Sequence, residues 1–168
     1  FVRDKDAVSA CVILAEIAAW AKDQGLSLYQ LLQKIYVEYG FSKEKGISVV
    51  KKGKSGAEEI EAMMKKFREN PLTEIAGSKV TYFYDYSTLK GKDYAENETV
   101  TLDMPTTSNV LQYFTEDNTK VSIRPSGTEP KIKFYCEVHS NVKSIDEVPE
   151  AEKAAEEKIN QIKASLGI

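Results

Sequence analysis

The sequence holds 168 residues of ordinary globular composition, enough for one domain, or one domain and part of another, with a buried core. Its net charge of -3 and pI near 5.4 argue against a general surface for nucleic acid or an anionic membrane, so any anion site must be local. The two cysteines, Cys11 and Cys136, lie in apolar segments without metal-site spacing, which predicts reduced core residues of a cytoplasmic protein.

The amino-terminal part contains an almost wholly apolar stretch from Ala7 to Lys22. Its polar positions, Ser9, Glu16 and Asp23, are seven residues apart, which predicts a helix covered nearly all round inside a larger α/β body. The stretch is too short for the ~20 apolar residues that span a membrane, and it lacks the cleavage pattern of a signal peptide. Because the chain begins on Phe1 and not on Met, we expect it to be cut from something longer.

A second helix and a strand are expected next. Ser27 with Gln30 forms a capping box ahead of helically spaced apolar residues. Ile47 to Val50 is a short strand candidate, and the Lys- and Gly-rich stretch after it is typical of an exposed linker. We place a domain boundary in this linker, between a first segment, residues 1–54, and a second segment, residues 55–168.

The second segment predicts helices at both ends and strands between them. Ser55 with Glu58 repeats the capping-box pattern before an apolar helical stripe, and residues 148–166 form an amphipathic helix. Residues 79–86 alternate, as in a sheet with one buried face, whereas residues 89–107 are irregular and polar. On this alternation, one face of the strand carries Val80, Tyr82, Tyr84 and Tyr86, and the other carries Thr81, Phe83 and Asp85. A hairpin and a final strand complete the order α-β-β-β-β-α.

The stretch Arg124–Tyr135, RPSGTEPKIKFY, reads as strand, tight turn, strand, and concentrates anion-binding groups more than any other run. The planar guanidinium group of Arg124 can bind a phosphate through its N–H donors, and Ser126 and Thr128 add hydroxyls. Gly127, without a Cβ, lets the backbone approach a ligand closely. The turn therefore predicts a phosphate cradle of short side chains and main-chain N–H groups.

The strand after the turn places lysines beside this cradle. Lys131, Lys133 and Tyr135 share one face of it, while the intervening apolar residues share the other. Two alternatives stay open for the turn itself: an ordinary hairpin turn, and a catalytic role for Ser126. For the second alternative no triad can be named, because the only histidine is His139.

The motif RPSGTEPKIKFY resembles the phosphate-binding loop of the fourth domain of the α-D-phosphohexomutases, the phosphoglucomutase and phosphomannomutase family. The sequence Arg3-Asp4-Lys5-Asp6-Ala7, followed by an apolar helix, resembles the segment after the sugar-recognition loop of that family's third domain, with Ala7 in place of the usual Gly. Residues 1–54 then correspond to the end of the third domain, and residues 55–168 to the fourth. Asp4 and Asp6 could instead be metal ligands, although carboxylates here are more typical of a helix start.

The resemblance implies an α+β fourth domain in which about four antiparallel strands pack with two helices, like the TATA-box-binding protein. It also implies a four-domain isomerase that moves a phosphoryl group between the C1 and C6 oxygens of a glucose or mannose phosphate. That enzyme uses a phosphoserine, Mg²⁺ and a hexose 1,6-bisphosphate intermediate. The fourth domain holds the phosphate that is not transferred. By the same resemblance, the phosphate-binding residues are Arg124, Ser126, Gly127, Thr128 and Lys133, and Lys5 and Lys131 are further candidate contacts.

No Ser-His-Asn phosphoserine loop, Asp-x-Asp-x-Asp metal loop or Glu-x-Ser sugar loop occurs in the sequence. We therefore expect no catalytic residue, no bound metal and no mutase activity from this chain alone, since phosphoryl transfer needs metal and cations around the reacting phosphate. The expected partners are a hexose phosphate and the other domains of the same protein, without nucleic acid or membrane. The apolar helix also predicts self-association of the isolated chain. The alternative function is a stand-alone, non-catalytic module for a phosphorylated ligand or a protein.

Overall fold

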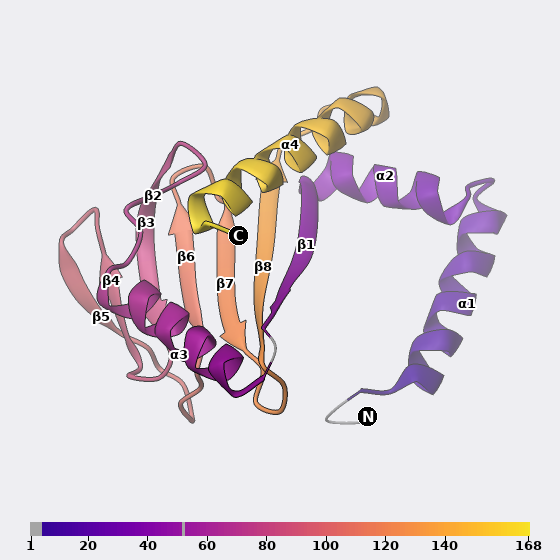
Figure 1. The fold of residues 1–168 in the computed structure, drawn as a ribbon. Helices are drawn as coiled ribbons and strands as arrows, with labels where there is room; N and C mark the ends of the chain where they lie inside the picture. Colours follow the sequence, from indigo (N-terminus) through magenta and orange to yellow (C-terminus); the bar gives the residue numbers. More distant parts are fainter. Residues whose placement is uncertain (1–4, 52) are drawn as a thin grey trace. The chain divides into compact units, whose positions relative to one another are not determined.

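The computed structural model describes residues 5–51 and 53–168, which form two compact units. One unit holds the residues up to Phe41 together with Ser140–Ala151, and the other holds Ser42–His139 together with Glu152–Ile168. Figure 1 labels the helices and strands along the chain. No helix of the described residues is long and apolar enough to cross a membrane.

The first unit contains helices α1 (Ala7–Asp23) and α2 (Leu28–Tyr39). Asp6 caps α1, because its Oδ1 accepts hydrogen bonds of 3.1 Å from the backbone N–H groups of Val8 and Ser9. The capping box of Ser27 and Gln30 at the start of α2 is confirmed. Asp6 thus serves the helix start, whereas Arg3 and Asp4 lie outside the described residues.

Helix α1 is far less covered than its sequence predicts. Only Ala21 is buried, while Val8 is 76% and Trp20 53% exposed. Cys11 is exposed as well, so its prediction as a core residue is wrong. The physical reason is that apolar side chains surround the whole helix, whereas α2, its neighbour in this unit, covers only a small part of it. Self-association through this helix stays a prediction.

The second unit is built on an antiparallel sheet with the strand order β1-β8-β7-β6-β3-β4-β5, and β2 pairs with β3. The strands are β1 (Phe41–Val50), β2 (Glu74–Ile75), β3 (Ser78–Asp85), β4 (Lys90–Asp93), β5 (Glu98–Thr101), β6 (Leu111–Thr115), β7 (Lys120–Pro125) and β8 (Lys131–Ser140). Helices α3 (Gly53–Glu69) and α4 (Val148–Leu166) cover the same face of this sheet (Figure 1). A 3₁₀ turn, η1 (Ile145–Glu147), leads into α4. The predicted antiparallel sheet packed with two helices is confirmed.

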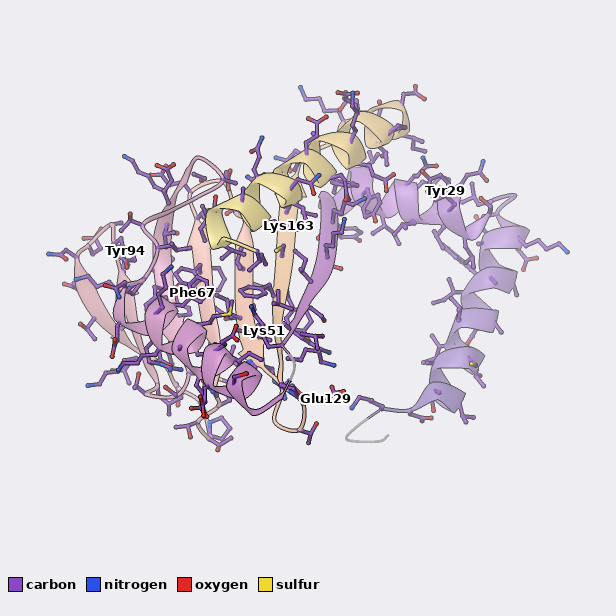
Figure 2. All side chains as sticks on the ribbon, in the orientation of Figure 1. Tyr29, Lys51, Phe67, Tyr94, Glu129 and Lys163 are labelled. Atoms are coloured by element: carbon purple, nitrogen blue, oxygen red, sulfur yellow. The ribbon has the colours of Figure 1, made fainter. Side chains whose placement is uncertain are left out.

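The core lies between the two helices and the sheet face that they cover. The ring centroids of Phe67 on α3 and Phe134 on β8 lie 6.1 Å apart, and Phe67 is labelled in this layer in Figure 2. The Tyr113 hydroxyl donates a 2.9 Å hydrogen bond to the Phe67 carbonyl, which satisfies its polar end inside the core. Cys136 is buried here as predicted, and burial raises the pKa of its thiol to about 11.

Strand β3 contains a β-bulge that the strict alternation of the sequence did not predict. The register against β6 shifts between Val80 and Tyr82, so the side chains change faces at this point. Val80 and Phe83 are both buried under the helices, while Tyr82 lies on the open face. The expectation that Val80 shares a face with the tyrosines and opposes Phe83 is therefore wrong.

The sheet is also larger than the four strands expected. Residues 89–107, interpreted as irregular, supply β4 and β5, whose Lys- and Glu-containing sequences have low strand propensity but pair along the edge of β3. The predicted strand at Ile47–Val50 is part of the longer β1, which lies beside β8. The sheet unit thus begins at Ser42, before the boundary placed at 54/55. Helix α3 begins at Gly53, so Ser55 lies inside its first turn and is not its cap.

Candidate functional site

The turn between β7 and β8 is held in shape by its own backbone. Ser126 N–H donates to the Lys131 carbonyl at 2.7 Å, and Lys131 N–H donates to the Glu129 carbonyl at 2.7 Å. Directly after the neighbouring β1, Lys51 N–H donates to the Pro130 carbonyl at 2.9 Å. Figure 2 labels Glu129 on this turn and Lys51 close by. These bonds give a short, closed turn at the end of two paired strands.

Two cations face each other where this turn leaves the sheet. Arg124 of β7 and Lys133 of β8 are directly opposite in the register, so their side chains share one face of the sheet. That face is the open one, because the neighbouring Ile123 and Phe134 point under the helices and are fully buried. Within residues 5–51 and 53–168, no hydrogen bond or ion pair engages the Arg124 guanidinium or the Lys133 ammonium group. Both groups can therefore bind an external anion.

Lys131 differs from these two cations because it has a partner inside the turn. Its Nζ lies 2.6 Å from a carboxylate oxygen of Glu129. The hydrogen bond and charge of Lys131, with a smaller contribution from Lys133, hold the pKa of Glu129 below its ordinary value. An anion in the turn would compete with Glu129 for Lys131, which makes Lys131 the weaker of the candidate contacts.

The turn borders a hollow of about 420 Å³ on the open face. Its lining combines the two free cations with the hydroxyl and backbone groups of the turn: Arg124, Pro125, Ser126, Gly127, Thr128, Glu129, Lys131, Lys133 and Tyr135. A Cβ placed on Gly127 would meet no atom within 4 Å, so the space above this backbone is open to a ligand. The Thr128 N–H reaches the Ser126 Oγ only at 3.5 Å, which leaves it with a weak internal bond. Chemically, this is a cationic hollow with hydroxyl and N–H donors, suited to a phosphate.

A second hollow, of about 620 Å³, lies on the other side of the same turn. It is walled by α3, with Ile60 and Met64, and by Arg68 and Asn109. The Arg68 side chain is fixed in place, since Nε donates to Asp85 Oδ2 at 2.9 Å and a terminal nitrogen donates to Asn109 Oδ1 at 2.8 Å. Nothing in the local sequence pattern marks this wall, because its residues meet only through the fold.

The described residues offer no alternative catalytic arrangement around Ser126. His139 lies near the far end of β8, where its Nε2 is 2.9 Å from Glu137 Oε1. No group of three or more His, Cys, Asp or Glu side chains that could hold a metal ion occurs in the described ranges. Lys5 belongs to the other compact unit, beside the α1 cap, so its contribution to the site stays a prediction.

The structure thus brings together the five residues expected to bind phosphate, Arg124, Ser126, Gly127, Thr128 and Lys133, with Lys131 beside them. The sequence pattern places Tyr135 on the same face as Lys133, but no role was predicted for it. The shared face was enough to predict that Tyr135 lies beside the cations. The sequence pattern missed Glu129, whose proximity to Lys131 depends on the turn geometry.

The family described as "Phosphoglucomutase/phosphomannomutase, C-terminal domain" matches residues 47–155. A phosphoglucomutase of Staphylococcus haemolyticus is 36% identical over 148 residues, which cover 88% of this chain and 26% of that protein. A phosphoglucomutase of Staphylococcus aureus is 38% identical over 135 residues, 80% of this chain and 24% of that protein.

Among solved structures, the open form of the exocytosis-sensitive phosphoprotein pp63/parafusin from Paramecium, a phosphoglucomutase, matches with a TM-score of 0.46 and 16% identity. The match covers 85% of this chain and 24% of that chain. The chain therefore spans about a quarter of the length of the curated relatives that it matches.

Proposed function

We propose, because the chain belongs to the phosphoglucomutase/phosphomannomutase family through that family's C-terminal domain, that its β7–β8 turn binds the phosphate group of a hexose phosphate. The observation that carries this proposal is the pair Arg124 and Lys133, two cations directly opposite each other, neither of whose charged groups makes a hydrogen bond or ion pair with a described residue. They border a hollow lined by the hydroxyls of Ser126 and Thr128. A phosphate there would receive charge-assisted hydrogen bonds from both sides.

Each residue of the turn has a distinct task in this proposal. Arg124 presents two parallel N–H groups to two phosphate oxygens, and Lys133 adds a point charge from the opposite strand. Ser126 and Thr128 donate through their hydroxyls, and the backbone at Gly127 approaches without a Cβ between it and the ligand. Lys131 joins when an anion draws it away from Glu129. The turn thus fixes one end of the ligand and breaks no bond itself.

In the longer protein, the proposed activity is transfer of a phosphoryl group between the C1 and C6 oxygens of a glucose or mannose phosphate. The present chain holds the phosphate that stays in place, which orients the sugar for reaction at its other end. No group of three or more His, Cys, Asp or Glu side chains that could hold a metal ion occurs among the described residues, and the proposal gives this chain no role that involves a metal. A phosphoserine, Mg²⁺ and a hexose 1,6-bisphosphate intermediate belong, in this proposal, to the rest of the protein, and the isolated chain is inactive.

Further parts of the proposal concern the remaining segments. The fourth domain of the family, in this proposal, comprises residues 55–168 together with strand β1, and the residues before β1 contain the end of the third. Lys5 is a candidate substrate contact from that first segment. The cytoplasm is the proposed location, and the other domains of the same protein are the expected partners.

The test is Arg124→Ala in the longer protein that carries this chain. We expect kcat/KM for the hexose phosphate to fall. The fall should correspond to a loss of about 1.5–3 kcal/mol of transition-state stabilisation, the usual contribution of a hydrogen bond to a charged group. Lys92→Ala is the matched control, since it removes a positive charge from β4, outside the hollow. Unchanged kinetics for Arg124→Ala, or an equal loss for Lys92→Ala, would refute the assignment.

A further inference from the structure

The open face beside the cationic hollow carries an aromatic side chain that phosphate binding does not use. Tyr135 lines the hollow together with Arg124 and Lys133, and it is 43% exposed. It follows Lys133 by two residues on β8, so the two side chains leave the same face about 6.6–6.8 Å apart along the strand.

The Tyr135 ring is supported from the neighbouring strand. A Cβ built on Gly46 of β1 would lie 3.9 Å from the Tyr135 Cδ1 atom, so the ring lies alongside backbone that has no side chain of its own. Among the described residues, no hydrogen bond engages the Tyr135 hydroxyl. Tyr135 thus contacts β1 and also lines the hollow, and its exposed part is accessible to a ligand.

A polar row crosses the open face and ends opposite Tyr135. The Tyr86 hydroxyl donates to Gln112 Oε1 at 2.8 Å, and Gln112 Nε2 donates to Ser122 Oγ at 3.0 Å. Ser122 is paired with Tyr135 in the register of β7 and β8. Because the Ser122 oxygen already accepts a hydrogen bond, its own O–H is left to donate, and no described residue accepts from it.

We infer that Tyr135 and Ser122 form a subsite for the sugar ring of the hexose phosphate whose phosphate occupies the cationic hollow. The C–H face of a pyranose packs on the negative face of the aromatic ring, and a sugar hydroxyl accepts the hydrogen bond of Ser122. This inference rests on the proposed phosphate site, because the phosphate brings the sugar to Tyr135. It adds a ring contact, on the sheet face that holds the phosphate, to the sugar-recognition loop that the family resemblance places in the third domain.

The experiment titrates the purified 168-residue chain with glucose 6-phosphate and with glycerol 3-phosphate, a monoester of similar charge without a ring, and follows amide shifts by NMR. The wild type should bind glucose 6-phosphate about five- to tenfold more tightly, as a contact of about 1–1.4 kcal/mol implies. Tyr135→Ala should abolish this preference and leave glycerol 3-phosphate binding unchanged, whereas Tyr135→Phe should keep it. Ser122→Ala should reduce it by a few fold. Tyr82→Ala is the control, since Tyr82 lies on the same face at similar exposure, 37%, outside the hollow.

The outcomes separate the two proposals. Equal affinity of the wild type for both phosphates, or an equal loss for both in Tyr135→Ala, overturns the ring subsite and leaves the phosphate site standing. Absence of binding of glycerol 3-phosphate at residues 124–133 overturns the phosphate site and the subsite with it. If Tyr135→Ala does not fold, saturation transfer from the Tyr135 ring to the sugar protons in the wild type tests the ring subsite instead. Transfer supports the subsite, and its absence overturns it.

Discussion

The two faces of the sheet come from the same strands, yet they have opposite character. On β7 and β8, Ile123 and Phe134 are fully buried under the helices, while the adjacent residues Arg124 and Lys133 lie on the open face. Alternation along a strand therefore builds the core and the binding surface from neighbouring positions. Substitutions on the covered face should therefore change stability, and substitutions on the open face should change ligand binding.

The largest effect is expected on the covered face. Phe134→Ala removes a ring that is 0% exposed and that contacts Phe67 in the core. We expect the free energy of unfolding to fall by about 3–5 kcal/mol, from lost burial and the cavity left behind. Urea unfolding followed by circular dichroism measures this change.

The matched control is Lys133→Ala, one position away on the open face. Its stability should stay within about 0.5 kcal/mol of the wild type, as for other surface substitutions. Similar losses of unfolding free energy in both variants would show that the open face contributes to stability as much as the covered face.

A smaller effect is expected at Gly127, on the turn itself. A Cβ there meets no protein atom within 4 Å, so Gly127→Ala should leave the unfolding free energy nearly unchanged. Binding of glycerol 3-phosphate should weaken by about 1 kcal/mol, because the added methyl group keeps the ligand from one backbone hydrogen bond. Calorimetry on the purified variant measures this, and full retention of binding would argue against a close backbone approach.

The smallest effect concerns an ion pair at the end of the sheet, between Asp117 in the β6–β7 turn and Lys158 on α4. Burial acts to raise the pKa of Asp117, but hydrogen bonds from Lys158 and two threonines outweigh it and hold the pKa well below its ordinary range. Because the pair is partly exposed, Asp117→Asn should lower stability by only about 0.5–1 kcal/mol after solvent screening.

The pH dependence of this variant has a definite sign. A carboxyl group whose pKa is lower in the folded state stabilises fully above the unfolded value of about 3.9, and this contribution disappears as the pH falls through the folded-state pKa. The stability difference between wild type and Asp117→Asn should thus be constant near neutral pH and shrink below about pH 4. Unfolding curves from pH 7 to pH 2 check this, and a difference that grows with acid would contradict it.

The sequence predicts that the residues of the turn lie together, because they are contiguous. Turn chemistry marks Arg124 and the hydroxyls after it, and strand alternation places Lys133 beside the turn, while the family resemblance assigns phosphate binding to both cations. That the two are directly opposite each other is seen only in the structure. The wall formed by Arg68 and Asn109 on the other side of the turn could not be predicted, because these residues meet only through tertiary contacts.

The errors in the predicted fold also have physical causes. After Val80, a β-bulge moves the following side chains of β3 to the opposite faces of the sheet. No residue type at this point in the sequence indicates the extra residue of the bulge. Strands β4 and β5 form because an edge strand offers them unpaired backbone groups, which outweighs their weak intrinsic propensity. Cys11 was expected in the core because its neighbours are apolar, but an apolar sequence does not itself supply a covering partner.

Every role proposed for this chain depends on phosphate binding at the open-face turn between β7 and β8. The most direct test of this binding is amide shift mapping of the isolated chain with inorganic phosphate, at ionic strength matched by chloride. Phosphate binding at the turn predicts saturable changes confined to residues 124–133, and the loss of these changes in Arg124→Ala. Changes centred elsewhere on the chain, or saturable changes that persist without the Arg124 side chain, would contradict it.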